Sequence, residues 1–248
     1  MALLEVRDLK VAFTTADGVV QAVRGLSFDV ERGSTLAIVG ESGSGKSVAT
    51  QTIAGLTRGA QVSGSARFDG IDLIGADPEV LRRVRGDEIA MIFQDPLSSL
   101  HPYYKVGWQI VEMIRAHDRG VSTEAARRRA AELLTVVGIP HAQSRIDDYP
   151  HQFSGGMRQR VMIAMAMALD PVLLIADEPT TALDVTVQAQ ILNLLNDLQK
   201  EFGSSIIIIT HDLGVVAELA DNIMVMYGGK AVEGSSADRI FYEAEHPY

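Results

Sequence analysis

The chain contains no cysteine among its 248 residues. This absence excludes disulfide bonds, thiolate zinc sites and iron–sulfur clusters. Positive charge is also scarce, since 22 Lys and Arg residues stand against 32 Asp and Glu, for a formal net charge of −10. Nucleic-acid binding uses clustered positive charge, so the composition argues against a nucleic-acid partner.

Long apolar runs are missing as well. The longest, from Val161 to Leu169, is far shorter than the ~20 residues that a membrane-spanning helix needs. The first ten residues carry Glu5, Arg7 and Asp8 and lack the apolar core of a signal peptide. We therefore expect a soluble, cytoplasmic chain whose link to any membrane is made through a partner.

Enough apolar residues remain, at 47% of the chain, to build one large domain or two small ones. Strand-like and helix-like patterns alternate near both ends, which predicts an α/β sandwich. Residues 36–39 are uniformly apolar, as is typical of a parallel strand buried on both faces. The patterns predict strands at 3–13, 27–30, 35–39, 89–93, 172–176, 205–210, 223–227 and 230–232, and helices at 46–56, at 185–202 and just after Asp212.

The middle of the chain has a different character, because strand patterns disappear between Asp95 and about Leu169. Helices are predicted at 106–116 and 123–137, the second with Ser122 as its N-cap and Gly138 as its stop. A third helix is expected to begin at the Ser-Gly-Gly turn of residues 154–156. We interpret residues 95–169 as a helical subdomain inserted into a core formed by residues 1–94 and 170–248.

A glycine-rich loop follows the apolar strand and reads Gly40-Glu41-Ser42-Gly43-Ser44-Gly45-Lys46-Ser47. Its glycines let backbone N–H groups converge on phosphate oxygens, and the helix that follows directs its positive dipole end at the same anion. Lys46 would supply charge for the β and γ phosphates, and the Ser47 hydroxyl suits Mg²⁺. A chance glycine-rich turn is less favoured, because a strand precedes this loop and a helix follows it.

Four polar residues follow other predicted strands, at the sheet edge where α/β proteins bind ligands. Asp177 is placed to hold Mg²⁺ directly or through water, and Glu178 to polarise an attacking water. Gln94 can bond both a Mg²⁺-bound water and the attacking water, and His211 is placed at the γ-phosphate. Asp177, Glu178 and Gln94 could each be an ordinary polar strand end if taken alone, and the surrounding motifs favour catalysis.

One further segment decides between nucleotide-binding families. It reads Phe153-Ser154-Gly155-Gly156-Met157-Arg158-Gln159-Arg160 and is followed by the apolar strand Leu173-Leu174-Ile175-Ala176 with Asp177-Glu178-Pro179. With the phosphate loop upstream, this chain resembles the ATP-binding cassette (ABC) ATPases. The resemblance implies a P-loop NTPase (RecA-like) core sheet, an antiparallel β subdomain and the inserted helical subdomain. It also implies ATP as the ligand and Mg²⁺ as the metal.

The resemblance further implies a nucleotide site shared between two chains. Ser154, Gly155 and Gly156 would form a second anion cradle that serves the ATP of a partner subunit. Asp184 would cross that interface, although the sequence alone makes it an N-cap for the helix at Val185. Phe13 would stack on the adenine, whereas by pattern alone it is a core residue.

The closest likeness is to importers of peptides and nickel. It is carried by Phe93-Gln94-Asp95-Pro96-Leu97-Ser98-Ser99-Leu100, by residues 149–157, by residues 210–218 and by the closing His246-Pro247-Tyr248. Such importers usually combine two different ATPase subunits, and Met157, where most cassettes have Gln, resembles the first of the two. The implied partners are a second ATPase subunit (in a heterodimer or a homodimer), two permease subunits at the cytoplasmic face of the cell membrane and, indirectly, an extracytoplasmic solute-binding protein.

Several points stay open. His101 replaces a usual Asn in a loop expected to face the membrane subunit, and Met157 lacks the hydrogen bonds of Gln, so the site built on it is expected to be less active. Relatives usually continue past the position of Tyr248 into a further tail. This chain is therefore either a shortened one or one that lacks the function of that tail. Import of nickel or another small solute, a cassette ATPase outside transport, and a non-enzymatic nucleotide-gated module remain as alternatives.

Overall fold

The computed structural model describes residues 2–181 and 183–248. They divide into two compact units, one made of the chain up to Arg82 together with Ser204–Tyr248, and the other of Arg83–Gly203. Among the described residues, no helix combines the length and the apolar character that crossing a membrane requires. The boundaries of the helical subdomain at 95 and 169 stay a prediction.

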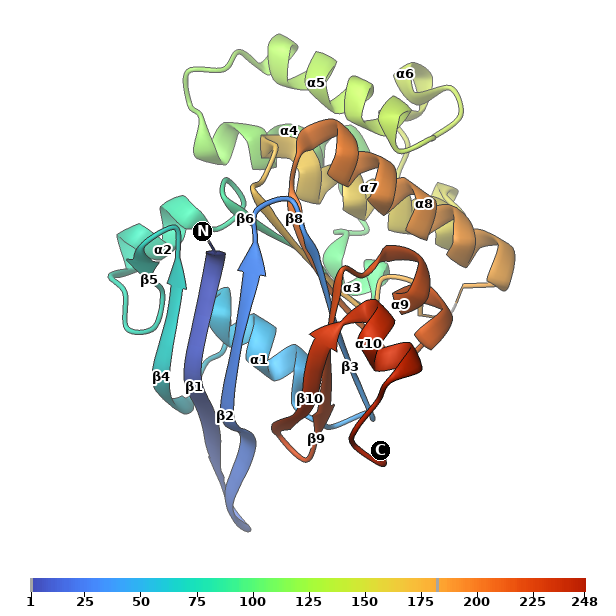
Figure 1. Cartoon of the computed structure of the whole chain (residues 1–248). Helices are drawn as coiled ribbons and strands as arrows, with labels where there is room; N and C mark the ends of the chain where they lie inside the picture. The colour runs from blue at the N-terminus through green and yellow to red at the C-terminus, as the bar shows by residue number, and fades with distance from the viewer. Residues whose placement is uncertain (1, 182) are drawn as a thin grey trace. The chain divides into compact units, whose positions relative to one another are not determined.

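The first unit contains an antiparallel sheet with strands in the order β2-β1-β4-β5 (Figure 1). These strands are β1 (Ala2–Thr15), β2 (Gly18–Glu31), β4 (Ala60–Phe68) and β5 (Ile71–Asp72). The predicted strands covered most of β1 but only the end of β2, and they missed β4 and β5. The reason is visible in β4, where most positions are at least partly exposed and Gly64 interrupts the alternation beside the backbone of Arg7 and Asp8.

A second set of strands in this unit runs in the order β10-β9-β3-β8. β3 (Thr35–Gly40) pairs in parallel with β8 (Ser205–Thr210) and β9 (Asn222–Tyr227), and β10 (Lys230–Ser236) is antiparallel to β9. β3 is buried along 35–39 and β8 along its whole length, as the uniformly apolar pattern predicts. The α1 helix (Lys46–Ile53) contacts β1, β2 and β3, and α9 (Leu213–Leu219) contacts β3 and β8, while α10 (Ala237–Tyr242) contacts β9 and β10.

The second unit holds a parallel pair of strands, β6 (Ile89–Ile92) and β7 (Leu173–Asp177). The short helix α2 (Pro78–Val84) leads into this unit. Most residues of the unit outside the two strands are helical. Its helices are α3 (Pro96–Ser99), α4 (Val106–His117), α5 (Thr123–Val136), α6 (Ala142–Arg145), α7 (Gly155–Ala166) and α8 (Val185–Phe202), with 3-10 turns η1 (Pro150–Gln152) and η2 (Met167–Leu169). In this unit α5 contacts α4, α6 and α7 (Figure 1).

The helix boundaries follow the local chemistry that predicted them. The Ser122 hydroxyl accepts from the Ala125 N–H at 3.1 Å and starts α5. The helix ends at Val136, two residues before Gly138 (φ 76°). α8 ends at Phe202, is followed by Gly203 in the left-handed conformation (φ 69°), and buries Ile191, Leu195 and Leu198. The α/β fold class is confirmed, with mixed and antiparallel strand sets.

Candidate nucleotide site

The predicted phosphate loop, Gly40–Ser47, connects β3 to α1, in the expected order of strand, loop and helix. Gly40 (φ 152°), Gly43 (φ 79°) and Gly45 (φ 96°) have backbone conformations that L side chains rarely adopt. A Cβ added at Gly40 would overlap the Met226 carbonyl oxygen, and one at Gly45 would overlap the carbonyl oxygen of Ala22. The loop therefore keeps this path only with glycine at those positions.

Lys46 is the first residue of α1 and is only 5% exposed. Its Nζ donates to the carbonyl oxygens of Gly40 at 2.7 Å and of Glu41 at 2.9 Å. These bonds fold the side chain back over its own loop, so the ammonium group lies where an anion held by the loop would meet it. A point charge of this kind suits phosphate.

The loop also satisfies a test of fit for a triphosphate. In the described part of the chain, the Ser44 hydroxyl is buried without a hydrogen-bond partner. An unsatisfied buried hydroxyl costs roughly 1–3 kcal/mol, and an anionic acceptor would remove that cost. Together with the glycine cradle and Lys46, this hydroxyl fits a phosphate group, and Ser47 adds the oxygen ligand that Mg²⁺ prefers.

His211 directly follows β8, in the same unit as the phosphate loop. It lines a pocket of about 700 Å³ together with Gly40, so the structure brings these two predicted residues to one hollow. The neighbouring Asp212 caps α9 by accepting from the Gly214 N–H at 2.8 Å. That cap fixes the backbone on which His211 is presented.

The second unit brings Gln94 and Glu178 into direct contact. Gln94 Nε2 donates to Glu178 Oε2 at 3.0 Å, and Thr181 Oγ1 donates to the same oxygen at 2.9 Å. Asp177 ends β7 and is 4% exposed, while Glu178 has a left-handed backbone (φ 46°). Thr181 was missed by the sequence analysis, because a threonine after Glu-Pro carries no signal of its own.

The Ser-Gly-Gly turn starts α7. The Ser154 hydroxyl accepts from the Met157 N–H at 3.4 Å and caps the helix, and Ser154 and Gly155 are exposed. A Cβ at Gly156 would lie 2.6 Å from Cγ1 of Val187 on α8, so the third position must stay a glycine unless that valine moves. The turn thus presents a hydroxyl and the N-terminus of a twelve-residue helix at the surface.

Asp184 and Phe13 were predicted with two interpretations each. The Asp184 carboxylate accepts from the Val187 N–H at 3.0 Å, which confirms its role as the N-cap of α8. Its neighbour Ala182 lies outside the described residues. Phe13 lies opposite Val20 on β2 and Ala60 on β4 and is half-buried rather than a core residue. The roles of both residues toward a nucleotide stay predictions.

The loop that contains His101 has an internal support. Buried Gln109 accepts from the His101 N–H at 2.9 Å and donates to the carbonyl oxygens of His101 at 3.0 Å and Tyr104 at 2.9 Å. Tyr104 stacks on Trp108 with ring centroids 4.3 Å apart. Tyr103 is 82% exposed, so this clasped loop presents aromatic rings to its surroundings.

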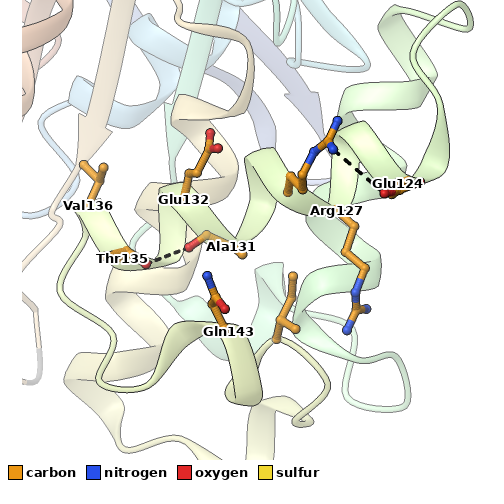
Figure 2. A pocket seen from close by; sticks show the side chains of 9 residues that line it. Glu124, Arg127, Ala131, Glu132, Thr135, Val136 and Gln143 are labelled. Carbon is orange, nitrogen blue, oxygen red and sulfur yellow. Dashed lines mark hydrogen bonds and ion pairs between the residues drawn. The ribbon is translucent and has the colours of Figure 1, made fainter.

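A separate groove of about 600 Å³ runs along α5 beside α6 (Figure 2). Glu124 and Arg128, which form an ion pair at its rim, line it together with Gln143 and the apolar Val136 and Ile146. None of the predicted site residues lies in this groove. The groove therefore shares no residue with the candidate nucleotide site described above.

Comparison with known proteins identifies the family. The sequence profile described as "ABC transporter" matches residues 23–181, which is more than half of the chain. The chain belongs to the ABC transporter family. The family prediction is thereby confirmed.

Among curated relatives, this ABC protein is 57% identical to the oligopeptide transport ATP-binding protein OppD of Bacillus subtilis, over 99% of the chain and 69% of that protein. It is 54% identical to the dipeptide transport ATP-binding protein DppD of Lactococcus lactis, over 99% of the chain and 71% of that protein. The solved ATP-binding cassette MJ0796, in a dimeric post-hydrolysis state with ADP and Pi, matches with a TM-score of 0.85 and 28% identity, over 94% of this chain and 98% of the other.

Proposed function

We propose that this chain is the ATP-hydrolysing subunit that powers a membrane importer of di- and oligopeptides. The observation that carries the proposal is the carboxylate of Glu178, held by Gln94 and Thr181 directly after a buried strand. This arrangement occurs in a chain that shares more than half of its residues with proteins named for oligopeptide and dipeptide transport. Those names favour peptides over nickel as the cargo.

ATP and Mg²⁺ would be held by residues that the geometry above supports. Gly40, Ser42, Gly43, Ser44 and Gly45 would surround the phosphates with backbone N–H groups and hydroxyls, and Lys46 would add charge. Ser47, Asp177 and Gln94 would hold the metal directly or through water. When bound, Mg²⁺ supplies neutralisation of the negative charge on the phosphate oxygens.

Hydrolysis requires a water that is oriented and partly deprotonated as it attacks phosphorus. Glu178 can accept that proton, because two donors hold one carboxylate oxygen and fix the orientation of the group. His211 would donate to the γ-phosphate, and Phe13, which is half-buried, would offer a ring face to adenine. Each of these roles needs only groups that this chain supplies.

The second half of each site would come from another ATPase subunit. Ser154, Gly155 and Gly156 stand exposed or half-exposed at the start of α7, and one ATP can hardly occupy both this cradle and the phosphate loop of the same chain. Two chains arranged head to tail would enclose two ATP molecules. Asp184 would contact the partner across the same interface while capping α8.

Two permease subunits would dock at the cytoplasmic face of the cell membrane, and an extracytoplasmic solute-binding protein would deliver cargo to them. Gln94 and the helical segment that follows it would transmit the state of the nucleotide. The clasped loop with Tyr103 and Trp108 offers exposed aromatic rings for such a contact. Closure around ATP would drive the permease, and hydrolysis would reset it.

The test is reconstitution of the chain with its neighbouring permeases, second ATPase and binding protein in liposomes. We expect ATP hydrolysis to rise when the binding protein carries a di- or oligopeptide, and labelled peptide to enter or leave the vesicle in an ATP-dependent way. If Ni²⁺ and not peptides stimulated ATP hydrolysis, the assignment of peptides as the cargo would be wrong. If the rate of ATP hydrolysis were the same with and without every permease, a cassette ATPase with no role in transport would be favoured.

A further inference from the structure

Arg145, the last residue of α6, contacts the segment leading into the Ser-Gly-Gly turn in several ways. Its Nη2 donates to the Gln152 carbonyl oxygen at 2.9 Å, and its Nε donates to Asp148 at 2.9 Å. Its guanidinium carbon lies 4.2 Å from the centre of the Phe153 ring. Its Nη1 lies 3.6 Å from the sulfur of Met157, on the far side of the turn.

The surroundings make this arrangement rigid. The Arg145 side chain is 24% exposed, its partner Asp148 is 28% exposed, and Phe153 is 2% exposed. A guanidinium is planar, so its stacking on Phe153 and its bond to Asp148 together set the plane in which it donates to Gln152. The backbone just before Ser154 is thereby held in one place.

A second arginine restrains the same segment from the helix side. Arg158 on α7 donates from Nε to the Pro150 carbonyl oxygen at 2.8 Å. The segment from Pro150 to Phe153 is thus held by one arginine that precedes the turn and one that follows it. Arg158 belongs to the motif from which the family was identified, whereas Arg145 lies outside that motif.

We propose that Arg145 is a positioning residue for the Ser-Gly-Gly turn, which it holds in the conformation that receives the nucleotide of a second subunit. This inference rests on the proposed function of that turn in trans. Arg145 is part of neither the proposed phosphate loop nor the pair of residues that bonds Glu178. Its loss should therefore affect the shared site and spare the chain's own nucleotide binding.

The experiment compares four variants of the full chain, assembled with its partner subunit and permeases: Arg145→Ala, Arg145→Lys, Ser154→Arg and the control Arg128→Ala. Arg128 is an exposed arginine of the same unit whose ion pair is with Glu124. Mg-ATP affinity and thermal unfolding are measured on each isolated chain, and ATP turnover and its dependence on ATP concentration on each complex.

Displacement of a catalytic group by ~1 Å can lower a rate by about a hundredfold. We expect Arg145→Ala to lower turnover of the complex by about tenfold or more, with ATP affinity of the isolated chain within about twofold of the parent. Arg145→Lys should not restore turnover, because an ammonium cannot stack and donate in one plane. Arg128→Ala should match the parent.

The outcomes distinguish the trans role of the Ser-Gly-Gly turn from the positioning role of Arg145. If Ser154→Arg leaves turnover intact, the trans role of the turn is wrong. If Ser154→Arg abolishes turnover but Arg145→Ala does not reduce it, the positioning role is wrong, and full rescue by Arg145→Lys overturns it too. Should Arg145→Ala fail to fold, Phe153→Leu removes the stacked ring but keeps an apolar side chain, and unchanged turnover of that variant would contradict the inference.

Discussion

The backbone of Glu178 is left-handed, with φ at 46°, which is unusual for a residue other than glycine. Such conformations cost of order 1–3 kcal/mol and persist where neighbouring contacts fix them. Here Gln94 and Thr181 fix the side chain by donating to one carboxylate oxygen. The unusual backbone at this residue therefore coincides with a carboxylate that two donors hold in one orientation.

Glu178→Gln should preserve Mg-ATP binding and remove most hydrolysis. The amide keeps the size of the side chain and one oxygen that can accept from Gln94 and Thr181, but it cannot take a proton from water. Loss of a general base lowers rates by about a hundredfold or more. Nucleotide affinity and steady-state phosphate release of the complex measure the two effects, and unchanged turnover would refute this role of Glu178.

Lys46→Ala should instead weaken binding itself. The buried ammonium group folded over Gly40 and Glu41 is lost, and with it the charge next to the phosphates. Lys10→Ala in the same unit is a matched control, because Lys10 is exposed and bonds Asp8. Titration with Mg-ATP should give weaker binding only for the first variant; equal affinities would mean that Gly40–Ser47 is not the phosphate loop.

Residues that a local motif marks could be proposed as site residues from the sequence, and residues that matter only through a tertiary contact could not. Lys46 is marked by a strand, a glycine-rich loop and a helix in sequence order. Asp177 and Glu178 are marked by their place at the end of an apolar strand. Thr181 and Arg145 became visible only when the fold placed them against Glu178 and the Ser-Gly-Gly turn. Nothing in the residue types around those two positions marks them in the sequence.

At the scale of elements, α7 links local capping to the proposed assembly. Ser154→Arg should leave nucleotide binding to the isolated chain intact, because the phosphate loop is unchanged. It should prevent ATP-driven association, since a bulky side chain would occupy the exposed start of the helix. Light scattering with and without ATP in a Glu178→Gln background tests this, and normal association of the double variant would contradict the trans role.

An ion-pair cluster joins the start of α4 to α5. Asp147 accepts from Lys105 and from Arg127, and the bond to the Arg127 side chain holds the pKa of Asp147 below its usual value. A lowered folded-state pKa means stabilisation that is present above the unfolded-state pKa of about 3.9 and is lost as pH falls through the folded-state value.

Asp147→Asn should therefore lower the unfolding temperature slightly at pH 7, because the groups are partly exposed, and much less at pH 3. Thermal unfolding at the two pH values measures the difference. Glu124→Gln offers a comparison with an exposed carboxylate whose ion pair is longer, at 3.8 Å. An equal effect of Asp147→Asn at both pH values would show that the carboxylate acts through packing rather than charge.

Elements with strong signals were predicted well, and elements stabilised mainly by their neighbours were not. α8 and β8 were predicted with the same ends that the structure gives, because a cap, a glycine stop and a run of isoleucines define them. β4 was missed because its residues are mostly partly exposed, and it is held in place by pairing with β1. Such pairing depends on a distant segment and leaves little trace in a local window.

At the scale of the whole molecule, the chain is expected to be mostly monomeric and weakly active alone, because each nucleotide site would lack its second cradle. Its specific ATPase activity should rise with chain concentration, or on addition of the partner subunit. Activity measured across a wide dilution series would test this. A specific activity independent of concentration, in a protein that sediments as a monomer, would mean that one chain forms a complete site.

The hydroxyl that caps α7 has a consequence for how two subunits meet. The Ser154 hydroxyl accepts a hydrogen bond from the Met157 N–H, and its own proton can still be donated to a ligand. The phosphate loop likewise offers backbone N–H groups and the Lys46 ammonium. In the proposed dimer, both sets of donors would face the phosphates of one ATP. A polyanion between the two subunits would accept hydrogen bonds from both. The ATP that is hydrolysed would therefore also hold the dimer together.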